Sequence, residues 1–217
     1  GGRRMRQLLG QMLSGTMVSL LVFFLTLLFS IPLALPVALA RRSKSKILRV
    51  PVSLYVLVMR GTPLILQLIF VYFAPYYLFG ISYDRFTAVI IAFAVNYAAY
   101  FAEIYRGGID AIPKGQWEAA KVLGLTRTQT LFKIILPQVV RRILPAMGNE
   151  VITLVKDTAL AQTIGVAELF RVAQNASARQ FSTLPIFIAG VFYFVMNWLV
   201  TVAFEAAEKK LSYYKIH

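Results

Sequence analysis

Five stretches of the chain are apolar and almost free of charge, and polar segments separate them. They cover about residues 15–40, 51–79, 85–106, 138–156 and 183–204, and the fourth continues in broken form to about residue 170. A helix rises about 1.5 Å per residue, so about 20 apolar residues cross the ~30 Å hydrocarbon layer of a membrane. The pattern predicts an all-α integral membrane protein, with five transmembrane helices in a single domain over residues 1–217.

The first apolar run has distinctive features and flanks. Pro32 and Pro36 lie inside it and predict a kink. The run is too long for a signal peptide, and a basic cluster follows it directly. Three arginines near the N-terminus, Arg3, Arg4 and Arg6, precede the run, and we interpret the segment through Leu13 as an amphipathic helix in the membrane interface.

The distribution of basic residues predicts which loops face the cytoplasm. The loop 41–49, the segment 106–142 and the tail together hold fifteen Lys and Arg residues, whereas the segments on the other side hold six. Because cytoplasmic loops are enriched in Lys and Arg, the first group is expected inside the cell.

Composition supports the membrane class and excludes several kinds of site. Hydrophobic residues make up 59% of the 217 and charged residues 15%, and the net charge is +14. We attribute the positive charge to cytoplasmic loops rather than to nucleic-acid binding. The chain has no Cys and one His, at the C-terminus, so thiol chemistry is excluded and no metal site is expected.

The polar segment 113–137 interrupts the apolar pattern and reads as two short helices against the membrane face. Gly124 is expected to end the first helix, Thr126 or Thr128 to cap the second, and Pro137 to start the fourth apolar span. In the first helix one face is expected to hold Trp117, Ala120, Val122 and Leu123, and the other Glu118, Lys121 and Arg127. The alternative is an amphipathic loop that rests on lipid headgroups.

The residues of this segment resemble a known family. Glu118-Ala119-Ala120, Gly124, Ile134 and Leu136-Pro137 match, at every spacing, the cytoplasmic EAA motif of ABC-importer permease subunits. Other stretches resemble the polar amino acid (histidine/glutamine/arginine-type) uptake branch of that family; they are Arg60-Gly61-Thr62-Pro63-Leu64, Asn96-Tyr97-Ala98-Ala99-Tyr100 with Glu103 and Arg106, and Lys156-Asp157-Thr158-Ala159-Leu160.

The resemblance implies a type I ABC importer-like fold in which the polar segment forms a coupling helix. The residues that would contact the ATPase are Gln116, Trp117, Glu118, Ala119, Ala120, Lys121, Leu123 and Gly124. The implied partners are two ABC ATPase subunits, a second permease chain (the same chain or a sister), an extracytoplasmic substrate-binding protein and an amino acid. The implied location is the cell membrane of a prokaryote, and the implied mechanism is inward transport by alternating access.

The chain itself is expected to catalyse no bond chemistry. It has no Gly-x-x-x-x-Gly-Lys-Ser/Thr loop, so ATP and its Mg²⁺ belong to the partner ATPase. We assign no catalytic residue, no metal ligand and no bound cofactor to this chain.

Polar side chains within the apolar spans are candidates for substrate binding, because a charge at mid-bilayer costs at least about 2.5–3.5 kcal/mol. Asn96, Tyr100 and Glu103 share one helix face, and Asn149 and Glu150 lie at a similar depth in the fourth span. The alternative is helix packing, with Glu103 paired to an arginine, Arg106 or Arg60, and Asn96 bound to a neighbouring backbone. Glu150 has no cation of its own helix within four residues, which favours a basic substrate such as arginine, lysine or histidine.

The break after the fourth span offers a second candidate element. Asp157 or Thr158 is a plausible N-cap for the following helix, which would leave the N–H groups of Ala159 and Leu160 free to hold a substrate carboxylate. The alternative is a Lys156–Asp157 ion pair that stabilises the break. The aromatic residues Tyr97, Tyr100 and Phe101 are expected to cover the substrate stem.

Three other functional classes are weighed against this interpretation. A secondary transporter or channel needs inverted repeats or a pore-lining ring, and an intramembrane enzyme needs a set of catalytic side chains at membrane depth; the sequence displays neither. A receptor or scaffold would use the polar segment for binding alone, without substrate-dependent stimulation of an ATPase.

Overall fold

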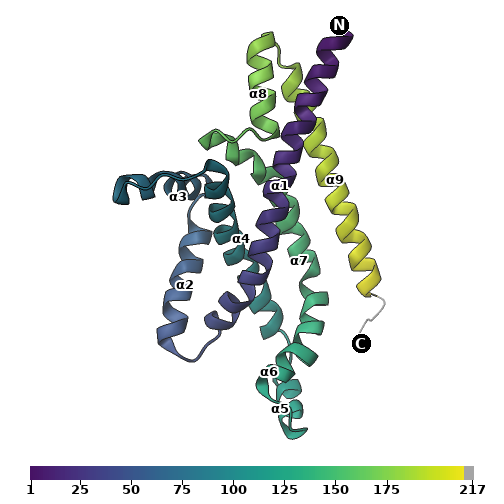
Figure 1. The fold of residues 1–217 in the computed structure, drawn as a ribbon. Helices are drawn as coiled ribbons and strands as arrows, with labels where there is room; N and C mark the ends of the chain where they lie inside the picture. Colours follow the sequence, from purple (N-terminus) through teal and green to yellow (C-terminus); the bar gives the residue numbers. More distant parts are fainter. Residues whose placement is uncertain (213–217) are drawn as a thin grey trace.

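The computed structural model describes residues 1–212, and every regular element within them is helical (Figure 1). The elements are α1 (Gly2–Arg41), α2 (Lys46–Gly61), α3 (Leu64–Phe79), α4 (Arg85–Asp110), α5 (Lys114–Val122), α6 (Arg127–Thr130), η1 (Leu131–Ile135), α7 (Leu136–Asp157), η2 (Thr158–Ile164), α8 (Leu169–Gln180) and α9 (Leu184–Ser212). The expected all-α class is confirmed. Lys215 and His217 of the tail lie outside the described residues.

The first helix is much longer than the apolar run that predicted it. α1 has 40 residues and continues through both Pro32 and Pro36, so neither proline ends it. At about 1.5 Å per residue it is about 60 Å long, twice the ~30 Å hydrocarbon layer. A separate interfacial helix at the N-terminus was wrongly predicted: Leu8 and Met12 continue α1 and are buried against apolar residues of α8 and α9.

α4 lies at the centre of the fold, in contact with α1, α2, α3 and α7. Its large side chains Phe93, Tyr97 and Phe101 are buried in the main core. α1 packs along α4, and the buried stripe of α1 includes the small residues Gly15, Ser19, Thr26, Ser30, Ala34 and Ala38. Small side chains let helix backbones approach closely where lipid supplies no hydrophobic force between them.

The second apolar run forms two helices instead of one straight span. The chain direction bends by 113° between α2 and α3, and the break falls at Thr62 and Pro63. Proline disfavours the helical conformation in the residue before it, and Thr62 is extended, with φ −123° and ψ 150°. α3 therefore projects sideways from the bundle (Figure 1), and aromatic residues such as Phe70, Tyr77 and Phe79 stay exposed on it.

Three helices within residues 1–212, α1, α4 and α9, are each long and apolar enough to cross a membrane, and α2 with α3 adds a fourth if the bent pair is one span. α7 falls outside this criterion because it carries Arg141, Arg142 and Glu150 among its apolar residues. The count of five spans therefore stays a prediction. The loop after α1, the α5–α6 segment and the end of α9 lie at one end of the molecule, and α8 lies at the other, which is the grouping expected from the basic residues (Figure 1).

The segment after α7 folds back against the start of α1. The sequence predicted a helical piece through Phe170, whereas α8 extends to Gln180. Glu168 is fully buried and caps α8, and its carboxylate accepts hydrogen bonds from the N–H groups of Phe170 and Arg171, both at 2.8 Å, and from the Tyr193 hydroxyl of α9 at 2.7 Å. The Leu169 N–H donates to the Ser19 hydroxyl of α1 at 3.1 Å. These bonds join α8 to both α1 and α9.

A glycine makes the contact between α1 and α8 possible. A Cβ atom at Gly15 would lie 2.9 Å from the Leu169 Cα atom, so Gly15→Ala forces the two backbones apart. We expect a loss of about 1–3 kcal/mol in stability from this overpacking. Gly10 is the matched control: it lies on the same helix with nothing within 4 Å of its Cβ position, and Gly10→Ala should raise stability by about 0.5–1 kcal/mol.

Thermal unfolding of the two purified variants in the same detergent checks this prediction. An apparent Tm for Gly15→Ala equal to or above that of Gly10→Ala would contradict the close packing of α1 on α8.

Candidate functional site

The polar segment forms a short rod that is fixed to the bundle along one side. Ala120 of α5 is 1% exposed, and Trp117 packs against a separate small core that includes Ile112 and Ile135. Gln116 and Gln138 of α7 exchange side-chain amide hydrogen bonds, with N–O distances of 3.1 and 2.6 Å. The rod is thus bound to the base of α7 by apolar contact and by a reciprocal amide pair.

The other side of the rod is free. Glu118, Ala119 and Lys121 are exposed, and Val122 and Leu123 are 86% and 78% exposed. The prediction that these last two residues share the face of Trp117 and Ala120 is wrong. Val122 lies about 200° around the helix from Ala120, and Leu123 is the C-cap residue, where the chain turns away. The result is an apolar tip that nothing in residues 1–212 covers.

Both ends of the turn after the rod agree with the sequence. Gly124 has φ +80°, and the Leu125 N–H donates to the Ala120 carbonyl at 3.0 Å, the pattern of a glycine-terminated helix. Thr126 caps α6 in a reciprocal capping box with Gln129. Gly124 as a terminator and Thr126 as a cap are therefore confirmed.

Pro137 lies in the first turn of α7, so the prediction that it starts the fourth span is confirmed. The chain is helical without interruption from Arg127 through α6, η1 and α7. η1 is a wide π-helical turn in which the Leu136 N–H donates to the Leu131 carbonyl. Pro137 has no N–H to donate to the carbonyl four residues earlier, which is consistent with a widened turn just before it.

Asn96 of α4 binds the bend between α2 and α3. Its side-chain amide donates to the Gln67 side chain at 2.9 Å and to the Met59 carbonyl at 3.3 Å. Gln67 in turn donates to the Met59 carbonyl at 3.1 Å and to the Thr62 hydroxyl at 2.8 Å. These contacts correspond to the helix-packing alternative for Asn96. Gln67 was missed by the sequence analysis, although a glutamine within an apolar run is itself a signal.

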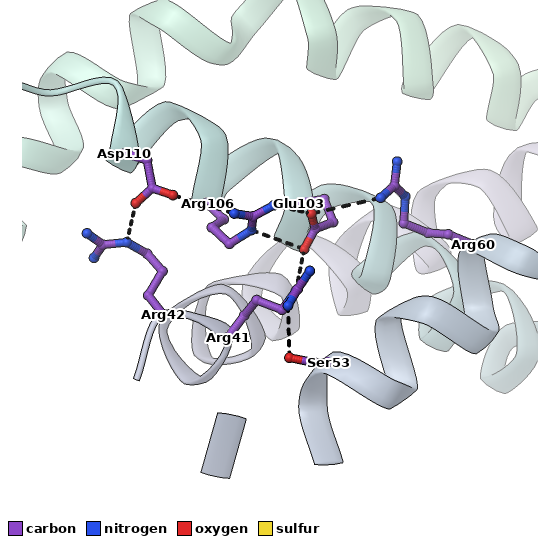
Figure 2. Close-up of polar contacts among 7 residues, drawn as sticks. All are labelled: Arg41, Arg42, Ser53, Arg60, Glu103, Arg106 and Asp110. Carbon is purple, nitrogen blue, oxygen red and sulfur yellow. Dashed lines mark hydrogen bonds and ion pairs between the residues drawn. The ribbon is translucent and has the colours of Figure 1, made fainter. Parts of the chain in front are cut away.

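Glu103 lies in a network of arginines at the end of the bundle where α1 meets α4 (Figure 2). Its carboxylate is 3.0 Å from Arg41 Nε, 2.7 Å from Arg106 Nη2 and 3.8 Å from Arg60 Nη1. Arg41 also donates to the Ser53 hydroxyl of α2 at 2.8 Å. The pairing with Arg106 and Arg60 that the sequence offered as an alternative is present, together with an additional pairing to Arg41.

The same network includes Asp110, which is 2.6 Å from Arg42 Nε and 3.6 Å from Arg106 Nη1 (Figure 2). The cluster contains four arginines, Arg41, Arg42, Arg60 and Arg106, against the two carboxylates of Glu103 and Asp110. The network fastens the end of α1 and the middle of α2 to α4.

Glu150 of α7 has different surroundings from Glu103. It is partly buried, and its carboxylate makes no hydrogen bond or ion pair within residues 1–212. It interacts electrostatically with Asp157 and Arg60. Its neighbour Asn149 is exposed, and the Asn149 carbonyl accepts from the Thr153 hydroxyl at 2.9 Å. Glu150 is therefore an acidic group close to a second acid and without a bound cation.

The break after α7 does not contain a helix start. Asp157 and Thr158 both have helical backbone angles, and α7 passes directly into the 3₁₀ helix η2. The Asp157 carboxylate accepts from the Tyr97 hydroxyl at 2.5 Å, and the Thr158 hydroxyl donates back to the Val155 carbonyl at 2.7 Å. The N-cap prediction for these residues is wrong, because a continuous helical path leaves no new N-terminus at Ala159 and Leu160.

The remaining residues of that stretch lie around Asp157. Lys156 is exposed and makes no ion pair with Asp157 within the described chain, whereas Ala159 and Leu160 are partly buried. Tyr97 and Tyr100 are neighbours with ring centroids 6.4 Å apart. Nothing in residues 1–212 groups three or more His, Cys, Asp or Glu side chains in a way that could hold a metal ion.

Arg60 is the residue that connects these groups, and from the sequence it was named only within a family motif and as a partner for Glu103. Its guanidinium lies 5.8 Å from the centroid of the Tyr100 ring, and it interacts with both Glu103 and Glu150. With Arg41 and Tyr100 it lines a cavity of about 330 Å³ between α2 and α4. Arg60 thus lies near Glu150, an acid without an ion pair in the described residues, and such a cation and acid are a suitable arrangement for a zwitterionic ligand.

Comparison with known proteins gives consistent matches over nearly the whole chain. A family model described as "Binding-protein-dependent transport system inner membrane component" matches residues 30–213. The L-cystine transport system permease protein TcyB of Bacillus subtilis (strain 168) is 44% identical over 192 residues, which are 88% of this chain and 82% of that protein. The arginine transport system permease protein ArtQ of the same organism is 37% identical over 201 residues, 92% of each chain.

One solved structure is similar in both sequence and fold. It is described as the crystal structure of an amino acid ABC transporter with histidines, and one of its chains superposes with a TM-score of 0.86 at 35% identity. The match covers 95% of this chain and 97% of that chain.

The arginine network generates a stability prediction. The Glu103 side chain is 12% exposed, so Glu103→Gln removes a shielded counter-charge from three partly exposed arginines and should cost about 1–3 kcal/mol in stability. Asp110→Asn is the matched control. The Asp110 side chain is 44% exposed, and loss of its ion pairs should cost less than about 1 kcal/mol.

Thermal unfolding of both variants in one detergent measures the difference. Equal Tm losses, or a larger loss for Asp110→Asn, would contradict the role of Glu103 as the shielded centre of the network.

Proposed function

The chain belongs to the binding-protein-dependent transport inner membrane component family as a permease subunit of an amino acid ABC importer, and on that premise we propose that its substrates are basic amino acids such as arginine, lysine or histidine. In this family the permease is non-catalytic, and a separate ATPase hydrolyses ATP. The family assignment overturns the secondary-transporter, intramembrane-enzyme and scaffold alternatives.

The observation that carries the substrate proposal is the pair of acids on α7. Glu150 has no hydrogen bond or ion pair within residues 1–212, and Asp157 accepts a single hydrogen bond, from Tyr97. A charge in an apolar layer is stable only with a partner, so a ligand with a distal cation would complete this site. ArtQ, an arginine permease by name, and the transporter solved with histidines agree with a basic ligand.

The groups around the acids have distinct proposed roles. We assign the substrate carboxylate to the Arg60 guanidinium, since the helix start expected at Ala159 and Leu160 is absent. Tyr100, Asn149, Lys156, Ala159 and Leu160 are proposed as walls of the site. Thr158 is excluded from it, because this residue is buried and lines a separate cavity with side chains of α1 and α9. Asn96 and Glu103 act indirectly, because their polar atoms already bind Gln67 and the arginines.

Cystine is a second candidate substrate, favoured by the 44% identity to TcyB. Its second ammonium group would occupy the position next to Glu150 in place of a side-chain cation. Its second carboxylate requires a further cation, and Lys156 is exposed and free of ion pairs in the described chain.

The exposed tip of α5 is proposed to dock in a groove of the ATPase. Val122 and Leu123 form an apolar surface with Glu118 and Lys121 at its edge, the composition of a small protein–protein contact. Movement of the rod would reach Glu150 through α7, to which Gln116 and Trp117 are bound.

The complete importer is proposed to contain two copies of this chain, two ATPase subunits and an extracytoplasmic binding protein. The projecting helix α3 supports a partner in the membrane plane, because its aromatic residues have no cover within residues 1–212. Two copies would place two acidic sites around one axis, and ATP binding would rock the copies between outward-open and inward-open states.

The first test concerns the substrate. Glu150→Gln removes one charge-assisted interaction, worth about 1.5–3 kcal/mol, so the arginine concentration that half-stimulates ATP hydrolysis should rise about tenfold to a hundredfold. The response to glutamine should change little. Reconstitution with the ATPase subunits and binding protein, followed by hydrolysis assays over a panel that includes cystine, measures both.

The matched control is Glu205→Gln, the same chemical change on α9. An unchanged arginine response in Glu150→Gln, or stimulation of the unmodified complex only by neutral or acidic amino acids, would exclude the basic-substrate proposal.

The second test concerns the docking surface. The chain has no Cys, so Leu123→Cys introduces a unique thiol at the exposed tip. A short thiol-to-amine reagent should join this variant to the ATPase in assembled complexes. Gln180→Cys, also exposed but at the opposite end of the molecule, should give no such product. If Leu123→Cys gave no cross-link to the ATPase subunit, the tip would dock elsewhere.

A further inference from the structure

A cavity of about 850 Å³ lies at the basic end of the molecule, between the end of α1, the loop 42–45, the start of α2 and the α5–α6 segment. The substrate and coupling proposals make no use of it. The exposed tip residues Val122 and Leu123 do not line it, so it is separate from the proposed ATPase contact.

The lining of this cavity has two chemically different parts. One wall is apolar and consists of side chains from α1, α2 and η1, including Val37, Leu48, Val52 and Leu131. The rim is basic, with Arg42, Lys44 and Arg127 contributed by three separate segments, and none of the lining residues is acidic. An apolar wall beside a cationic rim matches an amphipathic anion.

The basic residues of the rim differ in whether they already have an ion-pair or aromatic partner. Arg42 is paired with Asp110 at 2.6 Å, and the Arg127 guanidinium lies 5.9 Å from the centroid of the Trp117 ring. Lys44 is exposed and forms no hydrogen bond or ion pair within residues 1–212. Neither Lys44 nor Arg127 forms an ion pair with a carboxylate of the described chain, although Asp110 and Glu118 line an adjoining cavity with them.

The position of the cavity along α1 indicates its occupant. The apolar run of α1 ends at Ala40, and five basic residues follow between positions 41 and 49. This is the level at which a cytoplasmic membrane surface is expected, where anionic lipid attracts basic clusters beside membrane helices. We propose that the cavity binds one anionic phospholipid of the inner leaflet, with its phosphate between Lys44 and Arg127 and an acyl chain along Val37 and Val52.

A lipid in this place would connect the α1–α2 loop to the α5–α6 segment. Trp117 lines the cavity from the rod side, and Leu48 lines it from α2. The phospholipid would thus fill the space behind the coupling rod and support it against the bundle. This inference depends on the membrane orientation and does not depend on the identity of the transported amino acid.

The experiment uses the fluorescence of the two tryptophans. Trp198→Phe leaves Trp117 as the single reporter in the cavity, and the full chain is reconstituted in phosphatidylcholine vesicles that contain increasing fractions of brominated phosphatidylglycerol or brominated phosphatidylcholine. Trp117 should be quenched at a lower mole fraction of the anionic lipid than of the zwitterionic lipid. Lys44→Gln should raise the mole fraction of anionic lipid that gives half-maximal quenching about fivefold. A cation near an anionic membrane contributes about 1 kcal/mol to binding, which corresponds to about a fivefold change in affinity.

Two controls separate a built site from general surface charge. Lys46→Gln removes the same charge two residues away, outside the cavity lining, and should leave the preference intact. Trp117→Phe reports on Trp198 of α9, which is 57% exposed and should be quenched equally by both lipids. The proposal would be overturned if the two lipids quenched Trp117 equally or if neither quenched it. It would also be overturned if Lys46→Gln and Lys44→Gln had equal effects.

Discussion

A helix that carries an amide, a carboxylate and phenols through an apolar layer is stable only if each polar group finds a partner, and α4 is such a helix. Asn96 binds Gln67 at the α2–α3 bend, Tyr97 donates to Asp157 of α7, and Glu103 pairs with Arg41 of α1. Tyr105 donates to the Ile31 carbonyl, also on α1. The partners lie on α3, α7 and α1, and the two bonds to α1 are made at different positions along that helix. The polar groups of this central helix thus determine how α1, the bend and α7 are arranged around it.

α7 connects the coupling rod to the proposed substrate site. Its 22 residues span about 33 Å, with Gln138 bound to the coupling rod near one end and Asp157 bound to α4 at the other. Glu150 lies between them on the same rigid element. Because the rod is held to α7 by buried side chains as well as by the Gln116–Gln138 pair, it cannot move far without displacing α7. The wide turn η1, just before α7, is the least regular part of this connection.

The acids of this chain show why residue type alone does not identify a binding group. Glu103 and Glu150 both lie within apolar spans, and the same argument about the cost of a membrane charge applies to both. Glu103 is compensated by arginines from α1, α2 and α4, so it holds the bundle together. Glu150 has Asp157 nearby and no paired cation in the described residues, and this difference is the basis of its proposed role in ligand binding.

The sequence by itself determined the all-α class, the grouping of basic segments at one end of the molecule and the form of the coupling rod. These follow from local rules: hydrophobic run length sets membrane helices, Gly124 ends a helix because it tolerates positive φ, and Thr126 caps the next through its own side chain. Only the tertiary structure decided the bend at Thr62–Pro63, the docking of Leu8 and Met12 on α8, and the continuous path from α7 into η2. It also decided that Arg41, 62 residues from Glu103 in the chain, is one of the partners of that carboxylate. Such contacts depend on which helices become neighbours, and no rule based on adjacent residues contains that information.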